Sequence, residues 1–88
     1  MNTDFKPRFL RAIKKITDDV LKEEVEKIIC SVEKVETTKD IPELKKLKGY
    51  KIYYRIKVEN YRIGVSIEND LVTFVAFMHR KDIYKFFP

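Results

Sequence analysis

The stretch "YKIYYRIKVENYRIGVSIENDLVTFVAFMH" at residues 50–79 decides the fold. Apolar and polar side chains alternate through its first two thirds, which is the period-two pattern of strands with one buried face. Glu59-Asn60 and Asn69-Asp70 interrupt the pattern where tight turns fit, because Asn tolerates the left-handed backbone of such turns. The last third is apolar on both faces, as in a central or well-covered strand. The stretch therefore predicts an antiparallel meander over about 50–79.

The residues before this stretch show helical spacing. Pro7 suits the first turn of one helix, and "TDD" at 17–19 supplies an N-cap for another. The two apolar stripes are Phe5, Phe9, Ile13 and Ile16, followed by Leu21, Val25, Ile28, Val32 and Val35. We expect an antiparallel helical hairpin over about 5–36. "ELKKLKG" at 43–49 is expected to be a loop or a single turn.

The composition limits what the chain is. Its 88 residues make one α+β domain, a helical hairpin packed on an antiparallel sheet. A single cysteine and no apolar run near the ~20 residues of a membrane span predict a cytoplasmic protein that contacts no membrane. The net charge of +5 favours an anionic partner, with nucleic acid the first candidate. A basic surface that only aids solubility explains the charge equally well.

Cations collect on one face of the expected sheet. A tight turn after residue 58 places Lys57 opposite Arg62 and Arg55 opposite Gly64, and the next turn brings His79 to the same face. Like charges facing each other on a sheet are destabilising by roughly 0.2–1 kcal/mol, so an anion bound there would remove the repulsion. Gly64 has no side chain and would leave room for a phosphate. The alternative is that the long side chains splay apart in solvent.

These residue types supply what cleavage of RNA by its own 2′-hydroxyl requires. The reaction needs a proton acceptor, cations for the charge building on phosphorus, and a donor to the leaving 5′-oxygen. Arg62 and Lys57 carry charge at any physiological pH. Neutral His79 accepts a proton and its cation donates one. Tyr84 can stack on a base, and cations such as Arg80 would favour its phenolate form. No metal or other cofactor is expected, because the cations do the electrostatic work.

Two motifs resemble the RelE/ParE superfamily of bacterial toxins, and the resemblance covers nearly the whole chain. "YYRIKVENYRIGVSI" at 53–67 resembles the most recognisable segment of the family, and "HRKDIY" at 79–84 resembles its basic strand end followed by a tyrosine. The resemblance implies a RelE-like fold and a toxin of a type II toxin–antitoxin system. Such toxins are usually metal-independent endoribonucleases that cleave mRNA on the ribosome and inhibit translation. The implied partners are a cognate antitoxin, mRNA and the ribosome, with the chain a monomer or part of a toxin–antitoxin complex.

The resemblance also implies roles for particular residues. Arg55 and Arg62 would hold the scissile phosphate, and Arg80 and Tyr84 would stabilise the leaving group, stack on a base or move a proton. The position two before Arg55, a lysine in well-known nucleases, is Tyr53 here, which leaves the proton acceptor open. The first strand of the family corresponds at most to "NTDF" at 2–5. The candidate site is therefore catalytic Arg55, Arg62, His79, Arg80 and Tyr84, with RNA-binding Lys45, Lys46, Lys48, Lys51 and Lys57.

The C-terminal segment 80–88 is expected to be a short helix or an extended cover, docked by Ile83, Phe86 and Phe87. Two other functions stay open. One is a ParE-like protein that poisons DNA gyrase by binding, without catalysis. The other is an inactive relative that only binds an antitoxin.

Overall fold

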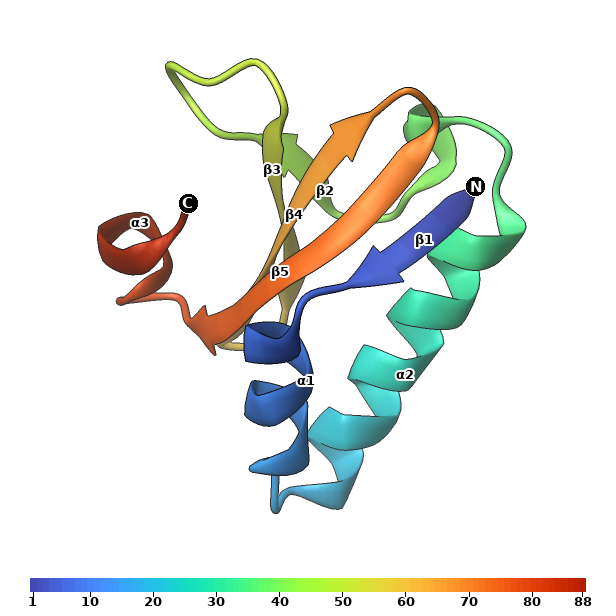
Figure 1. Cartoon of the computed structure of the whole chain (residues 1–88). Helices are drawn as coiled ribbons and strands as arrows, with labels where there is room; N and C mark the ends of the chain where they lie inside the picture. Colours follow the sequence, from blue (N-terminus) through green and yellow to red (C-terminus); the bar gives the residue numbers. More distant parts are fainter.

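A five-stranded mixed sheet forms the centre of the computed structural model, which describes all 88 residues (Figure 1). In chain order the elements are β1 (Asn2–Phe5), α1 (Pro7–Lys14), α2 (Asp19–Lys34), the 3-10 turn η1 (Thr38–Asp40), β2 (Leu44–Lys46), β3 (Tyr53–Val58), β4 (Tyr61–Glu68), β5 (Leu71–His79) and α3 (Ile83–Phe86). The strands lie in the order β1-β5-β4-β3-β2, and only β1 runs parallel to its neighbour. The α+β class is confirmed. None of the helices is long and apolar enough to cross a membrane.

The central meander follows the turns that the sequence predicts. Val58 pairs with Tyr61 at the first turn, where Glu59 has a φ of 54°. At the second turn Asn69 and Asp70 have φ values of 48° and 65°. Two successive residues with positive φ give a tight turn whose twist matches that of the strands. At the first turn Glu59, and not the expected Asn60, takes the left-handed backbone, and the two turns place β3, β4 and β5 side by side.

The main core lies between the sheet and the first two helices. Its fully buried side chains include Phe9 of α1, Val25 and Val32 of α2, and Ile56, Ile63, Val65, Val72 and Phe74 of the sheet. α2 begins at a capped end, because the Asp18 carboxylate accepts hydrogen bonds from the backbone N–H groups of Val20 (3.0 Å) and Leu21 (3.2 Å). The helical stripes that the sequence predicts therefore face this core.

Two local predictions in the first half of the chain are wrong, and a third is not confirmed. Phe5 lies in β1 and not in a helix, and "ELKKLKG" contains the edge strand β2 instead of a loop. The expected close pairing of the two helices is also not borne out, since α1 packs mainly on β5, whereas α2 packs on β1 and β3. The two strands span only three and four residues. Such short strands are defined by the neighbours they pair with, and their own residues are too few to show a period.

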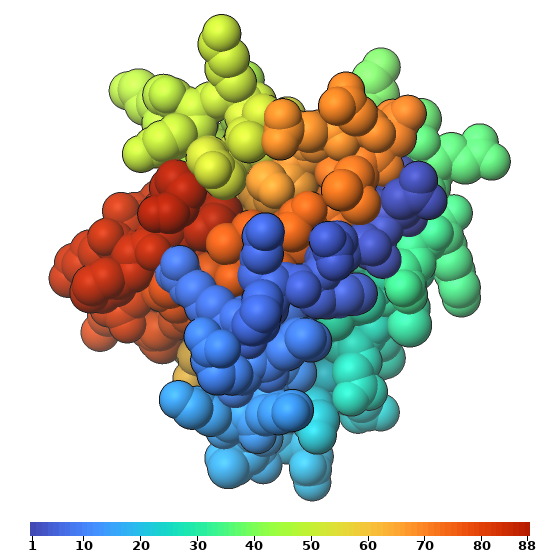
Figure 2. Space-filling model, viewed as in Figure 1, coloured from blue at the N-terminus to red at the C-terminus, as the bar shows by residue number.

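A smaller core lies on the sheet face away from α1 and α2, which we call the open face. Leu47, Ala76, Ile83 and Phe87 are buried together there and dock α3 on the sheet. Figure 2 shows this C-terminal segment adjoining the connection between β2 and β3. Phe86 is 60% exposed, so the expectation that it also docks the segment is wrong.

Candidate functional site

Four cations from three neighbouring strands share the open face, and we call them the basic cluster: Lys45, Arg55, Lys57 and Arg62. Across the sheet, Lys45 pairs with Arg55, and Lys57 pairs with Arg62. The residues between them along β3 and β4, such as Ile56 and Ile63, are buried in the main core. Because side chains alternate along a strand, the four cations point to the other side. The predicted pairings of Lys57 with Arg62 and of Arg55 with Gly64 are confirmed.

No carboxylate neutralises the basic cluster. The one ion pair in the chain joins Lys27 to Glu24 on α2, at 3.7 Å. Directly opposed cations on a sheet repel each other, so the cluster is destabilising until an anion binds. Its chemistry fits an anion that offers more than one acceptor oxygen, such as a phosphodiester of a nucleic acid.

Arg62 is held in place by the turn beside it. Its Nη1 donates to the backbone oxygens of Glu59 (3.1 Å) and Tyr61 (2.8 Å). The other N–H groups of the guanidinium have no partner within the protein, and a guanidinium has five donors in a fixed fork. Arg62 is thus positioned by the protein with donors left over for an anion.

Arg55 is also anchored at one nitrogen. Its Nη1 donates to the backbone oxygen of Glu43 (3.0 Å), just before β2. Its Nε is buried and has no hydrogen-bond partner. An unsatisfied buried donor costs about 1–3 kcal/mol. This cost indicates that Arg55 is not an optimal residue for stability at its position.

The prediction that His79 shares a face with Arg62 is wrong. A register shift between Gly64 and Val65 makes Arg62 the partner of Met78 and Tyr61 the partner of His79. The imidazole contacts the Tyr61 ring edge-on, with centroids 5.4 Å apart. One extra residue in a strand moves every later side chain to the opposite face. His79 therefore lies on the side of the helices, away from the basic cluster.

Arg80 and Tyr84 belong to the C-terminal segment. The backbone N–H of Arg80 donates to the oxygen of Asn60 at 2.8 Å, which places Arg80 beside the turn that also holds Arg62. Tyr84 lies on α3 and is 63% exposed. Its phenol is therefore accessible to solvent.

The five lysines expected to bind RNA separate into three groups. Lys45 and Lys57 belong to the basic cluster, and Lys48 and Lys51 are exposed in the connection between β2 and β3. Lys46 pairs with Tyr54, whose ring packs on the main core, so it points to the side of the helices. The structure thus divides two adjacent lysines of β2 between opposite faces.

Gly64 does not leave room for a phosphate. A Cβ at this position would lie 2.8 Å from the ring of Phe87, which fills the space.

The sequence also gives no signal for Arg8, whose Nη2 donates to the backbone oxygen of Phe86 at 2.7 Å. The two residues are 78 positions apart, so only the folded chain reveals the contact.

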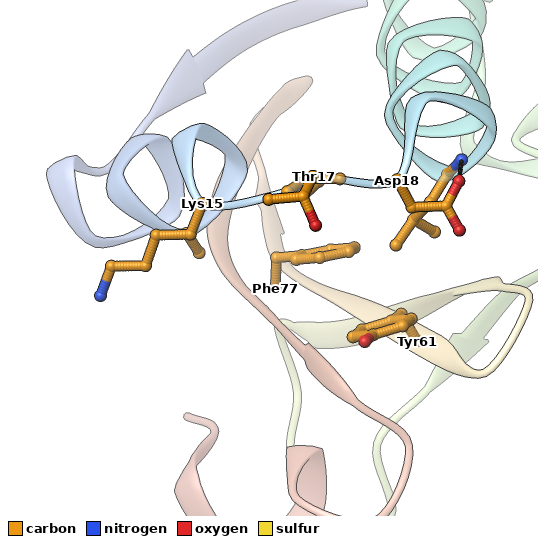
Figure 3. A pocket seen from close by; sticks show the side chains of 8 residues that line it. Lys15, Thr17, Asp18, Tyr61 and Phe77 are labelled. Atoms are coloured by element: carbon orange, nitrogen blue, oxygen red, sulfur yellow. Dashed lines mark hydrogen bonds between the residues drawn. The ribbon is translucent and has the colours of Figure 1, made fainter.

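A separate groove lies on the side of the helices (Figure 3). A cavity of about 310 Å³ is lined by Ala12, Lys15, Ile16, Thr17, Asp18, Leu21, Tyr61 and Phe77. The Tyr61 and Phe77 rings stack in it with centroids 5.1 Å apart. The lining is mostly apolar, and it holds one carboxylate and one ammonium group but no imidazole or thiol. The basic cluster is therefore the better candidate for chemistry.

The sequence and the fold both match known toxins. Residues 4–84 match the family model of the ParE toxin of type II toxin–antitoxin systems. Toxin RelE3 from Methanocaldococcus jannaschii is 36% identical over 89 residues, an alignment that covers 100% of each chain. A chain of the RelB–RelE antitoxin–toxin complex from Methanococcus jannaschii superposes with a TM-score of 0.79 at 32% identity, covering 97% of this chain and 99% of that one.

A more distant structure shares the fold alone. A chain of the archaeal RelE–RelB complex from Pyrococcus horikoshii OT3 gives a TM-score of 0.72 at 13% identity, covering 90% of this chain and 93% of the other. The family model spans nearly the whole chain, and the 36% identical relative is aligned from end to end. The chain therefore belongs to the ParE toxin family, within the RelE/ParE superfamily, and is a toxin of a type II toxin–antitoxin system.

Proposed function

We propose that this toxin is an endoribonuclease that cleaves mRNA on the ribosome and thereby inhibits translation. The observation that supports the proposal best is the pairing of Lys57 with Arg62 on the open face, beside Arg55 and Lys45, with no carboxylate to neutralise them. A phosphodiester is the anion that such a cluster suits, and RNA is the phosphodiester that carries its own nucleophile, the 2′-hydroxyl.

The proposed reaction assigns a task to each cation. The 2′-oxygen attacks phosphorus, the bond to the 5′-oxygen breaks, and the products are a cyclic phosphate and a 5′-hydroxyl. Arg55 and Arg62 hold the non-bridging oxygens and stabilise the charge that builds on them. Arg80 stabilises the leaving 5′-oxygen from the neighbouring turn. Lys45 and Lys57 bind the flanking backbone together with Lys48 and Lys51.

Proton transfer is assigned to Tyr84. A proton must leave the 2′-hydroxyl and another must reach the 5′-oxygen. His79 faces the helices and not Arg62, so we do not propose it for either task. The phenol of Tyr84 is 63% exposed and lies in the segment that packs on the open face. It also has an aromatic ring on which a base can stack.

The proposed surroundings follow from the proposed reaction. Translated mRNA is found in the cytoplasm, so the toxin would act there. We also propose a cognate antitoxin that covers the basic cluster with an acidic or amphipathic segment, since the structural relatives from both archaea were solved as complexes with RelB. Alone, the chain would be a monomer.

A ParE-like poison of DNA gyrase is the second candidate, because the matching family model carries that name. A protein that acts only by binding gyrase has no need of a phosphate site built from opposed cations, which favours the nuclease. Primer extension on translated mRNA after brief expression distinguishes the two. Cuts within codons, absent with Arg62→Ala, support the nuclease. Gyrase–DNA breaks with intact mRNA support the poison, and neither lesion indicates an inactive relative that only binds an antitoxin.

A further inference from the structure

We infer that Gly64 and Phe87 are positioning residues: their contact holds the C-terminal segment, and with it Tyr84, on the open face beside the basic cluster. The catalytic part of this inference rests on the proposed nuclease function. The contact itself rests on the packing of the open face alone.

The contact is too close for any side chain larger than glycine. A Cβ at position 64 would lie 2.8 Å from Cδ1, Cδ2 and Cε2 of the Phe87 ring. Gly64 has no positive φ, so the backbone does not require a glycine there. Glycine also weakens the interior of a strand. The ring of Phe87 is therefore the feature that requires glycine in the middle of β4.

Phe87 and Ile83 are the two buried anchors of the C-terminal segment. Ile83 is fully buried and Phe87 is 3% exposed, and both pack with Leu47 and Ala76. The Phe87 ring also meets the Tyr53 ring edge-on, with centroids 5.5 Å apart. α3 has only four residues, and a helix so short has no stability of its own. The place of α3 is therefore set by its anchors.

Tyr84 lies between these anchors in the chain and is itself exposed. Its side chain belongs to neither core, so its position is set by the backbone of α3, which the two anchors and the Arg8 hydrogen bond to the Phe86 oxygen hold on the sheet. Gly64 is also the register partner of Arg55. The ring thus rests on the residue directly across from a cation of the cluster, which links the location of Tyr84 to that of Arg55.

The experiment compares Gly64→Ala with Ser66→Ala, a matched control on the same strand and the same face. Each purified toxin is assayed for kcat and KM on ribosome-bound mRNA and for amide exchange at residues 83–87. A methyl group at position 64 expels the ring but leaves the main core untouched. We expect Gly64→Ala to lower kcat about 10- to 100-fold, as small misplacements of a catalytic group do, with KM changed less than about threefold. The amide of Phe87, bonded to Ile83 at 2.9 Å, should lose its protection, and Ser66→Ala should match the parent.

Two further variants separate positioning from general damage. If Gly64 acts through Tyr84, adding Gly64→Ala to Tyr84→Ala causes no further loss of kcat. If the clash is with the ring, Phe87→Leu in the Gly64→Ala background restores protection and brings kcat to within about threefold of the Phe87→Leu single variant. The inference would be contradicted if the losses of kcat multiply in the Gly64→Ala/Tyr84→Ala variant. It would also be contradicted if Phe87→Leu restores neither protection nor kcat in the Gly64→Ala background.

The remaining outcomes are also decisive. A Gly64→Ala variant that cleaves at the parent rate with its C-terminal segment released overturns the positioning role. A Gly64→Ala variant whose residues 83–87 keep full protection from amide exchange would show that the Gly64–Phe87 contact does not hold the segment. If the parent toxin leaves mRNA intact, the proposed nuclease function is wrong. The amide exchange of Gly64→Ala then still tests whether the Gly64–Phe87 contact holds the C-terminal segment.

Discussion

Lys57 and Arg62 lie directly across from each other on β3 and β4, and Nη1 of Arg62 donates to the backbone oxygens of Glu59 and Tyr61. The backbone of the β3–β4 turn thus keeps Arg62 close to Lys57, although the two charges repel each other. The sequence shows only the repulsion between the two cations, and the structure adds two hydrogen bonds that hold Arg62. They keep the guanidinium in one orientation in spite of the repulsion.

Arg62→Ala should abolish toxicity without unfolding the protein. Two hydrogen bonds of about 0.5–1.5 kcal/mol each are lost, and relief of a repulsion of roughly 0.2–1 kcal/mol offsets part of this. We expect the free energy of unfolding to fall by about 1–2 kcal/mol. The cleavage rate should fall by about 10²–10³, as after loss of one oxyanion donor. Growth after induction, thermal melting and primer extension measure the three effects.

Arg62→Lys is the matched control for charge. It should restore only part of the activity, because an ammonium cannot grip two oxygens as a guanidinium does. An alanine variant that stays fully toxic would defeat the assignment. So would one that is harmless because it no longer folds.

Lys45→Ala and Lys46→Ala test which face of the sheet binds RNA. The two lysines are adjacent on β2 and both are exposed, but only Lys45 lies with Arg55 on the open face. Lys45→Ala should weaken RNA binding and reduce the salt slope of the affinity by about 0.7–0.9 for the one lost phosphate contact. Lys46→Ala should change neither. Titrations of labelled RNA at several salt concentrations provide the measurement, and equal losses for both variants would show that the face is wrongly assigned.

Arg55→Met should separate function from stability. It removes the hydrogen bond to the Glu43 oxygen, but also the buried Nε that has no partner. These effects oppose each other, so we expect the free energy of unfolding to stay within about 1 kcal/mol of the parent value. Cleavage should fall by about 10² or more. Urea denaturation and the cleavage assay test this, and a loss of stability of roughly 3 kcal/mol would mean that Arg55 is a structural residue.

Asp18→Ala should destabilise the protein without affecting cleavage. The carboxylate caps α2 through the N–H groups of Val20 and Leu21, and such caps contribute about 0.5–2 kcal/mol. We expect the melting temperature to fall by about 4–8 °C for each kcal/mol. Asp18→Asn keeps an acceptor oxygen and should melt close to the parent. A melting temperature that is the same for the alanine and asparagine variants would contradict the capping role.

Association with the proposed antitoxin should slow as salt rises. A cationic face and an acidic segment attract each other at long range, and dissolved ions screen this attraction. Stopped-flow rates at low and high salt should differ for the parent, and the difference should shrink in the double variant Lys45→Ala/Lys57→Ala. A rate that does not depend on salt would show that the antitoxin docks elsewhere.

The parts of the fold that follow from local sequence were predictable. Asn69 and Asp70 define their own turn, and the pairing of Lys57 with Arg62 follows by counting outward from Glu59. Arg55, Lys57 and Arg62 could therefore be placed on one face from the sequence. Lys45 could not, because the sequence did not predict the strand β2 in which it lies.

Most of the errors depend on how separate segments of the chain pack together. The side of the sheet on which His79 lies depends on a register shift between Gly64 and Val65. No turn residue in the sequence indicates this shift. The space above Gly64 is filled by Phe87, which lies in the C-terminal segment after β5. Such contacts are decided by the packing of the whole chain, and a local pattern of apolar and polar residues does not contain them.

The position of β5 between β1 and β4 has a consequence for how the toxin is made. β1 joins the rest of the sheet only through β5, residues 71–79, which are translated after every other strand. While the chain is being synthesised, β1 and α1 emerge long before β5, the strand on which both pack, and contacts so distant in sequence form late. A nascent chain therefore has no complete sheet, and no Arg80 or Tyr84, until almost all of it has been translated. A chain that stops before residue 71 lacks β5. It should therefore neither fold nor be toxic.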